Sequence, residues 1–327
     1  MRQIAVGLIG AGKHGLRYAG HIRADVPALT LAALSRRDAA AGAAQARTLG
    51  CRFHADWHAL VDDPGVHAVI AVVPPMLHPE IAAAVSKAKK PFLIEKPFAP
   101  TAAAAVDMIR TLRAADVPCL MAHTLRWNTV VRALRERLPG LGTLRAMMVN
   151  QRFEPSRLAW LDDPGQSGAG MVLHTGVHSF DLVRHLTGRE VVRVSCRTAR
   201  AVTRRTEDNF MAILELDGSP ALVAVNGSRA TAGRSGLIDM AGEAGQLVGD
   251  HALGFAYAVR GLDRTPLAVP PPVQTVRAVL ESFVRLIETG EAPPVGIEDG
   301  ARAVQIAEAC LASAASGAPV PVPPLTL

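Results

Sequence analysis

A glycine-rich turn at residues 10–15 constrains the fold of this 327-residue chain more than any other feature. A continuous apolar run at 3–10 leads into the turn, and an apolar helical pattern follows it. The turn reads Gly10-Ala11-Gly12-Lys13-His14-Gly15, which is the pattern G-x-G-x-x-G. An unbroken apolar run is typical of a strand buried on both faces, so the opening predicts a parallel sheet covered by helices.

Between a strand and a helix, this glycine pattern predicts the binding of a dinucleotide. Gly10 permits the tight turn, Gly12 lets the backbone approach a pyrophosphate, and Gly15 allows close packing of the helix on the strand. The free N–H groups at the helix N-terminus favour an anion, and Lys13 and His14 complete the expected cofactor contacts. The alternative is a plain tight turn.

The second predicted strand, at 29–35, ends in Ser35-Arg36-Arg37. The acidic residue that bonds the ribose 2′-hydroxyl of NAD belongs near Ser35, and none stands there. A hydroxyl and two guanidiniums suit a 2′-phosphate instead, through charge-assisted bonds of about 1.5–3 kcal/mol each. The sequence therefore favours NADP(H), with NAD(H) as the second choice. The alternative is an arginine pair that merely opens the following helix, with Asp38 as its cap.

A second informative segment is Glu95-Lys96-Pro97, which ends a short apolar strand near residues 91–95. Lys96 is one of only five lysines among the 35 cationic residues of the chain. Arginine stays protonated, whereas a lysine loses its proton when it is desolvated. A lysine kept at a strand end is therefore a candidate for proton transfer. The alternative is a surface Glu–Lys pair at a loop.

Composition argues against several other classes of protein. The four cysteines are widely scattered, which predicts neither a disulfide framework nor a metal site and favours the reducing cytoplasm. The net charge is +6, but no dense basic tract with interleaved aromatic residues occurs, so we expect no nucleic-acid partner. The opening is too glycine-rich for a signal peptide and no apolar run reaches membrane-spanning length, so no membrane partner is expected.

Strand and helix patterns alternate up to about residue 122, which predicts a doubly wound α/β domain at 1–122. Its strands are expected near 3–9, 29–35, 51–54, 67–73, 91–95 and 117–122, and its helices near 13–24, 38–49, 56–62, 77–90 and 100–115. A further helix is expected near 127–138, just after the boundary. A second domain at 123–327 is richer in strands, and an antiparallel sheet with helices on one face is expected. Its strands are expected near 144–153, 191–199, 209–216, 221–225, 237–240 and 246–249, and its helices near 172–187, 273–289 and 298–316.

His174, His178, Asp181 and His185 are spaced four, three and four within one predicted helix, which puts them on one face. One interpretation is a catalytic stripe that faces a pocket. A second is a metal site, since two histidines four apart can chelate an ion, although no nearby cysteine or carboxylate completes a ligand set. The third is ordinary structure, with Asp181 and His185 as a surface pair. The glycine-rich lead-in at 168–170 favours catalysis, and we expect no metal.

The chain resembles the glucose–fructose oxidoreductase, inositol dehydrogenase and MocA (Gfo/Idh/MocA) family over nearly its full length. The resemblance rests on the order and spacing of several segments: Gly10-Ala11-Gly12, Pro74-Pro75-Met76-Leu77-His78, Glu95-Lys96-Pro97, Gly168-Ala169-Gly170, Gly176-Val177-His178, Asp181, Asp299-Gly300 and Ser313-Ala314-Ala315-Ser316-Gly317. It implies a Rossmann domain followed by an α+β domain with an open, mostly antiparallel sheet. It also implies an NAD(P)-dependent oxidoreductase that acts on CH–OH groups of a sugar or polyol, and a homodimer or homotetramer formed through the open sheet face.

The resemblance carries roles over to individual residues. Lys96 matches the catalytic lysine of the family, and His178 matches its catalytic histidine. Pro74, His78 and Glu95 lie in the matching segments and are expected to contact the cofactor.

One departure from the family pattern affects the chemistry. His174 stands where the family usually has aspartate, and Pro75 stands where it usually has asparagine. A neutral histidine orients its neighbour or relays a proton, but it supplies no negative charge. Two alternatives to a dehydrogenase therefore stay open: a cofactor-binding sensor, and a non-redox lyase or glycosidase.

Four residues are candidates for substrate binding, because their segments are expected to line a cleft between the domains. They are His123, Arg126, Arg152 and Trp160. Either arginine suits a carboxylate, and the indole suits a sugar face. The alternatives are a solvated surface for the arginines and core packing for Trp160.

Overall fold

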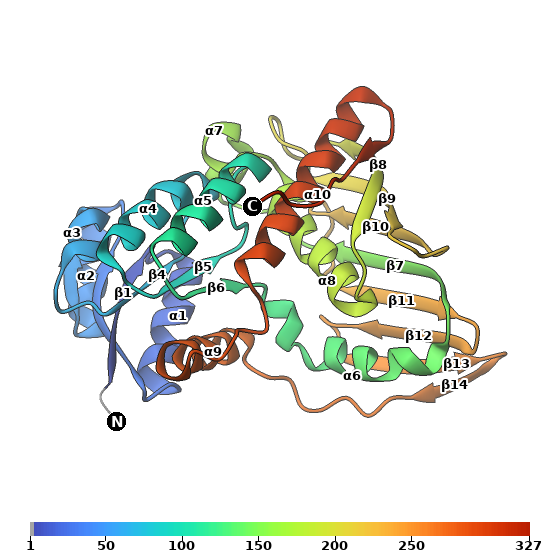
Figure 1. Ribbon diagram of the computed structural model, residues 1–327, viewed down its shortest axis with the longest axis horizontal. Helices are drawn as coiled ribbons and strands as arrows, with labels where there is room; N and C mark the ends of the chain where they lie inside the picture. Colours follow the sequence, from blue (N-terminus) through green and yellow to red (C-terminus); the bar gives the residue numbers. More distant parts are fainter. Residues whose placement is uncertain (1–2) are drawn as a thin grey trace. The chain divides into compact units, whose positions relative to one another are not determined.

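The computed structural model describes residues 3–327; Met1 and Arg2, with which the predicted N-terminal domain begins, lie outside the described residues. The chain divides into two compact units, whose elements are labelled in Figure 1. The N-terminal unit comprises the chain up to Thr124, Gln274–Ala301 and Leu327. The second unit comprises Leu125–Val273 and Arg302–Thr326.

A six-stranded parallel sheet with the order β3-β2-β1-β4-β5-β6 forms the centre of the N-terminal unit. Its strands are β1 (Ile4–Ile9), β2 (Leu29–Ser35), β3 (Arg52–His54), β4 (Ala68–Ala71), β5 (Phe92–Glu95) and β6 (Cys119–Ala122). Every residue of β4 and β5 is buried, as the unbroken apolar runs predict. The strand order reverses between β1 and β4, and open α/β sheets bind ligands outside the strand ends at such a point.

Helices cover this sheet, and one of them comes from a distant part of the chain. The helical elements are α1 (Lys13–Ala24), α2 (Ala39–Leu49), α3 (Trp57–Asp62), η1 (Pro75–Leu77), α4 (His78–Ala88), α5 (Ala102–Ala114) and α9 (Thr275–Thr289). In Figure 1, α4 lies beside α5, and α9 lies beside α1. The sequence prediction divides the chain once, after residue 122, whereas the structure groups 274–301 with the N-terminal unit. The physical reason is that α9 packs its apolar face on α1 and β6.

A nine-stranded sheet forms the second unit, in the order β14-β13-β12-β11-β7-β10-β9-β8-β15. Its strands are β7 (Leu144–Arg152), β8 (Val191–Ala199), β9 (Asn209–Leu216), β10 (Leu222–Ser228), β11 (Leu237–Gly242), β12 (Gly245–Asp250), β13 (Phe255–Arg260), β14 (Asp263–Pro266) and β15 (Val320–Pro321). Within this sheet, as far as residues 3–327 form it, the pair β7–β10 is parallel and the other neighbouring strands are antiparallel. The predicted fold class, a parallel Rossmann sheet followed by a mostly antiparallel sheet, is confirmed.

Helices of the second unit pack on one face of its sheet, with α8 against β7 and α6 against β12 and β13. The helical elements are η2 (Thr124–Trp127), α6 (Thr129–Arg137), η3 (Leu138–Leu141), η4 (Ala159–Asp162), α7 (Pro164–Ser167), η5 (Val172–Gly176), α8 (Val177–Thr187) and α10 (Ile297–Ser316). The opposite face carries Met211, Ile213 and Leu222, each more than half exposed. Within residues 3–327, no helix is both long and apolar enough to cross a membrane.

The sequence prediction differs from the structure of this unit in its last strands and in one helix. The prediction lacks the strands β13, β14 and β15. Every residue of β14 is exposed, so this strand has no alternating apolar pattern. The prediction also has one continuous helix over 172–187, where the structure has the π-helical turn η5 before α8.

The turn between β1 and α1 has no space for side chains at two of its glycines. Gly10 has a φ of +96°, and a Cβ on it would lie 2.2 Å from the carbonyl oxygen of Val72. A Cβ on Gly15 would lie 1.9 Å from the carbonyl oxygen of Gly10. Around Gly12, by contrast, a Cβ would meet no atom within 4 Å. Packing therefore requires glycine at positions 10 and 15, while Gly12 borders open space.

We predict that Gly15→Ala lowers the free energy of unfolding by about 1–3 kcal/mol, because the added methyl group must displace backbone. Gly20→Ala, at an exposed position of the same helix where a Cβ would meet no atom within 4 Å, is the matched control and should not lower this free energy. Urea unfolding of the two variants and the unaltered chain measures both effects. Equal destabilisation by the two substitutions would contradict the prediction.

Candidate active site

The N-terminus of α1 offers exposed backbone donors beside the open space at Gly12. Gly12 is the N-cap of the helix, no side chain caps it, and the first turn holds no acidic residue. Lys13 and His14 begin the helix at this point. The free N–H groups and the helix dipole favour an anion there, and no carboxylate of the first turn opposes it. This cradle fits the pyrophosphate of a dinucleotide, with Gly12, Lys13 and His14 around it.

The end of β2 lies beside the same turn. Arg36 donates a hydrogen bond from Nη1 to the carbonyl oxygen of Ala11 at 3.3 Å, so its guanidinium lies at the glycine turn. Ser35 is buried and Arg37 is exposed. Asp38 caps α2, as the alternative interpretation of this segment requires. The helix cap and a phosphate-binding role for Arg36 are compatible, because they use different side chains.

β5 ends in a buried carboxylate that is bonded from two directions. Oε1 of Glu95 accepts a hydrogen bond from the Tyr18 hydroxyl at 2.6 Å and from His14 Nε2 at 2.8 Å. Oε2 accepts from the Lys96 backbone N–H at 3.0 Å. Burial by itself raises the pKa of Glu95, but the His14 bond and charge, the Lys96 charge and the Tyr18 bond outweigh it and lower the pKa to about 2. Burial and the nearby Glu95 carboxylate raise the pKa of Tyr18. The ionised carboxylate thus fastens the segment before Lys96 to α1.

His78 supports the turn that follows Lys96. Its ring is fully buried, and Nδ1 donates to the carbonyl oxygen of Phe98 at 3.1 Å. Burial lowers the pKa of His78 to about 4, so the ring is neutral at pH 7. Its Nε2 has no hydrogen-bond partner within residues 3–327. Direct cofactor contacts of His78, Glu95 and the partly exposed Pro74 stay predictions, and the observed bonds give His78 and Glu95 a positioning role.

The second group of candidate residues lies in the other unit. His174 is 3% exposed, and its Nε2 lies 2.9 Å from the carbonyl oxygen of Ser167. A carbonyl only accepts hydrogen bonds, so Nε2 of His174 carries a proton and donates it to Ser167. The Trp160 ring stands edge-on to His174, with 5.2 Å between ring centroids. The structure therefore brings together two predicted site residues from separate segments.

His178 is the second residue of α8 and is half-buried. Because η5 is π-helical, His174 and His178 do not lie on one continuous α-helix, and the predicted stripe of side chains is interrupted between them. Single π turns inside helices often occur at functional sites. Among the described residues, no group of three or more His, Cys, Asp or Glu side chains is placed to hold a metal ion.

Arg126 and Asp181 form a buried ion pair that differs from expectation. Nε and Nη2 of Arg126 donate to the two carboxylate oxygens of Asp181 at 2.9 and 2.6 Å. The side chains are 9% and 1% exposed. Asp181 is therefore not part of a surface pair, because its buried charge is matched by a guanidinium. Arg126 thus joins η2 to α8, and its contact with a substrate carboxylate stays a prediction.

Arg152 lies on the open face of its sheet, because alternate residues of a strand point to opposite faces. Its neighbour Gln151 points to the covered face, where Nε2 donates to the Ser179 hydroxyl at 3.1 Å. Gln151 thus lies under α8, and Arg152 lies on the side away from that helix. His123, at the end of β6, is 1% exposed and belongs to the N-terminal unit. Substrate contacts of Arg152 and His123 stay predictions that these positions do not support.

Sequence reasoning missed Arg229, which lies beside the His174 segment. Its Nη2 donates to the hydroxyl of Thr175 at 2.9 Å, across 54 residues of sequence. Arg229 follows the last residue of β10, and Thr175 follows His174 directly. The sequence shows an arginine after an apolar strand, but only the strand register shows which helix that strand end meets.

The comparisons with known proteins identify the family through both units. The sequence matches the family described as "Oxidoreductase family, NAD-binding Rossmann fold" over residues 4–123. It matches the "GFO/IDH/MocA C-terminal domain" over residues 137–248.

Two curated relatives cover nearly the whole chain. The chain is 28% identical to inositol 2-dehydrogenase 2 of Saccharopolyspora erythraea, over 97% of this chain and 95% of that protein. It is 24% identical to myo-inositol 2-dehydrogenase of Thermotoga maritima, over 91% of this chain and 92% of that protein.

Solved structures share the fold at lower identity. Levoglucosan dehydrogenase in complex with NADH and levoglucosan has a TM-score of 0.88 at 21% identity, covering 99% of this chain and 100% of that one. Aldose-aldose oxidoreductase from Caulobacter crescentus, complexed with glycerol, has a TM-score of 0.89 at 22% identity, covering 98% and 100%. With both of its domains matched, the chain belongs to the Gfo/Idh/MocA family of NAD-binding oxidoreductases.

Proposed function

We propose that this chain transfers a hydride between NAD(P) and a CH–OH group of a sugar, polyol or related hydroxy or keto compound. The observation that carries the proposal is the pair of histidines at the η5–α8 junction, one buried and bonded to the Ser167 carbonyl, the other half-exposed. The substrate class is supported by relatives named inositol and levoglucosan dehydrogenases.

In this proposal, bound NAD(P) supplies the hydride acceptor in oxidation and the hydride donor in reduction. His178 takes the proton of the substrate hydroxyl as the hydride leaves, and returns it in the reverse direction. Lys96 polarises the same oxygen or passes the proton on. His174 is held by Ser167 and orients or relays, in the position where the family usually has aspartate.

We predict that His178→Asn lowers turnover by about 10²–10⁴, the usual scale for a positioned acid or base. Lys96→Arg should also lose most of its turnover, because arginine keeps the charge but does not release its proton. The measurement is the steady-state rate of NAD(P)H formation with a panel of polyols and sugars. His58→Asn and Lys87→Arg, on α3 and α4, are matched controls that should keep normal rates.

Near-normal turnover in both site variants would remove these roles. Tight cofactor binding by the unaltered chain without turnover of any polyol would favour the sensor. Release of a reducing sugar without a net change in NAD(P)H would favour the lyase or glycosidase.

We also propose that NADP(H) is preferred over NAD(H). The proposal is supported by the lack of an acidic residue at the end of β2 and by the bond from Arg36 to the glycine turn. Ser35 and Arg37 flank Arg36 and are the other expected ligands of a 2′-phosphate.

We predict that NADPH binds more tightly than NADH, and that changing Arg36 and Arg37 together to alanine narrows the ratio of dissociation constants by about tenfold or more. Arg47→Ala, in the last turn of the helix α2 that follows Arg37, is the control for loss of a positive charge away from the glycine turn. Fluorescence titration of each protein with both cofactors measures the ratio. Equal affinities of the unaltered protein for NADPH and NADH would sink this proposal.

A homodimer or homotetramer formed through the open face of the second sheet is our third proposal. The exposed side chains of Met211, Ile213 and Leu222 support it, because β9 and β10 are paired in register and present these apolar groups on one face. We place the protein in the cytoplasm, in keeping with four free cysteines in the described chain, and cell fractionation tests this.

We predict that Ile213→Lys reduces the assembly to monomers in light scattering, since a charge in the centre of an apolar interface must be desolvated. Arg145→Ala, at the exposed start of β7, should leave the mass unchanged. A monomeric unaltered protein at micromolar concentration would contradict the proposal.

A further inference from the structure

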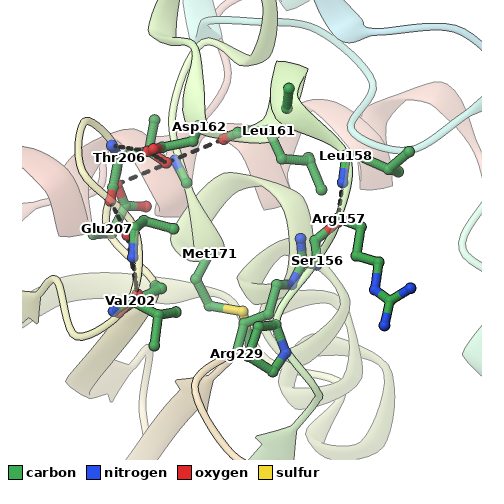
Figure 2. Close-up of a pocket in the computed structure, with 15 residues that line it drawn as sticks. Ser156, Arg157, Leu158, Leu161, Asp162, Met171, Val202, Thr206, Glu207 and Arg229 are labelled. Carbon is green, nitrogen blue, oxygen red and sulfur yellow. Dashed lines mark hydrogen bonds between the residues drawn. The ribbon is translucent and has the colours of Figure 1, made fainter.

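A cavity of about 200 Å³ lies wholly within the second unit, beside the His174 segment. Figure 2 shows the side chains around it, which come from two loops, the start of η5 and the end of β10. We call it the Arg229 pocket; its lining includes Ser156, Leu161, Met171, Val202, Glu207 and Arg229. Its volume exceeds that of a single water several times over, so it has space for part of an organic ligand.

Arg229 differs from the other inward-facing arginines of this unit in lacking a carboxylate partner. Arg126 pairs with Asp181, and both Arg184 and Arg302 pair with Glu190. The ion pairs of residues 3–327 include none with Arg229. A hydrogen bond to the Thr175 hydroxyl is a neutral contact and leaves the cation uncompensated.

Burial lowers the pKa of Arg229, because the guanidinium is partly removed from water. A buried guanidinium is stabilised when an anion reaches it, and its planar fork matches a carboxylate in two parallel hydrogen bonds. The pocket therefore holds a cation with unused capacity to bind an anion.

Acidic side chains also line the pocket, but their oxygens are occupied by backbone donors. Asp162 accepts from the N–H groups of Arg204, Arg205 and Thr206, and these bonds lower its pKa to about 2. Asp208 accepts likewise from the N–H groups of 201–203. These carboxylates shape the loop that forms one wall of the pocket.

Glu207 is the third acidic lining residue. It accepts from the backbone N–H groups of Gly170 and Val172. Burial raises the pKa of Glu207, which favours its uncharged form and so reduces its repulsion of a ligand anion. The positive charge that can pair with a ligand anion in this pocket is therefore that of Arg229.

The pocket adjoins the candidate catalytic histidines. Thr175, whose hydroxyl accepts a hydrogen bond from Arg229, directly follows His174 and precedes His178 by three residues. Trp160, whose ring contacts His174, lies between the lining residues Ala159 and Leu161. A group bound at Arg229 therefore lies beside the segment that carries both histidines.

On this basis we propose that Arg229 binds the carboxylate of an acidic sugar, so that the substrate is a polyhydroxy acid such as an aldonate or uronate. The inference deepens the proposed function and rests on it. Hydride transfer then takes place at a hydroxyl-bearing carbon near the carboxylate, with the proton going to His178 as before.

The test compares matched substrates: glucuronate with glucose, gluconate with glucitol, and glucose 6-phosphate as a second anion. The unaltered enzyme should show kcat/KM at least tenfold higher for the acids than for their neutral partners. In Arg229→Gln the ratio of acid to neutral kcat/KM should fall by about 10- to 100-fold, from loss of the charge-assisted pair. Arg145→Gln, an exposed arginine paired with Glu243, should leave the ratio unchanged.

Equal kcat/KM for the acids and their neutral partners in the unaltered enzyme would overturn the inference, whether or not the variant folds. An equal loss for both classes in Arg229→Gln would make Arg229 a structural support for Thr175. A preference for glucose 6-phosphate over glucuronate would overturn the carboxylate assignment.

A thermal-shift measurement separates this inference from the proposed function. Gluconate or glucuronate should raise the Tm of the unaltered protein and have a smaller effect on Arg229→Gln. If no substrate is turned over but this difference appears, the proposed function fails and the anion site stands. If neutral polyols are turned over and neither acid shifts the Tm, the anion site fails and the proposed function stands.

Discussion

The Glu95 carboxylate is the contact on which the N-terminal half of the site depends. It lies in the interior at the end of β5, and it bonds Tyr18 and His14 of the helix whose N-terminus forms the cradle. Removing one partner would leave a buried charge uncompensated, which is far more costly than losing a surface pair. The glycine turn and the segment of Lys96 are therefore held by the same group.

This arrangement also links stability to pH in a defined direction. The pKa of Glu95 is lowered from 4.5 to about 2, so its contribution is present above the unfolded value and is lost as the pH falls toward 2. The shift corresponds to a contribution on the order of 3 kcal/mol. At neutral pH Glu95 is ionised and makes its hydrogen bonds to Tyr18, His14 and the Lys96 backbone, while His78 is neutral.

Local patterns in the sequence predict most of the fold. The alternation of apolar runs with helical patterns predicts the parallel sheet, and the apolar run before Gly10 predicts the glycine turn, because each of these patterns is local in the chain. The position of α9 is not local: its apolar periodicity predicts a helix, but nothing nearby shows that its partner is α1. The identity of Arg126 predicts a cation, and only tertiary packing shows that Asp181 is its partner.

In the candidate site, too, the sequence predicts some features, and only the tertiary structure shows the others. His174 and His178 stand out in the sequence because of their spacing, yet the π-helical turn between them carries no clear sequence signal. Arg152 and Arg229 look alike in the sequence, since each lies at the end of a strand. Strand parity places Arg152 on the open face, while Arg229 reaches Thr175 on the covered side. Long-range register therefore decides which of the two lies beside the histidines.

The N-terminal unit includes α9 from late in the chain, and this has a consequence for synthesis in the cell. The ribosome completes β1 to β6 long before it makes α9, because the whole of residues 125–273 lies between them. During that interval the face of α1 that α9 covers is exposed, while most of the second unit is being synthesised. The Rossmann unit thus reaches its final packing only near the end of translation, when α9 completes the first domain to emerge.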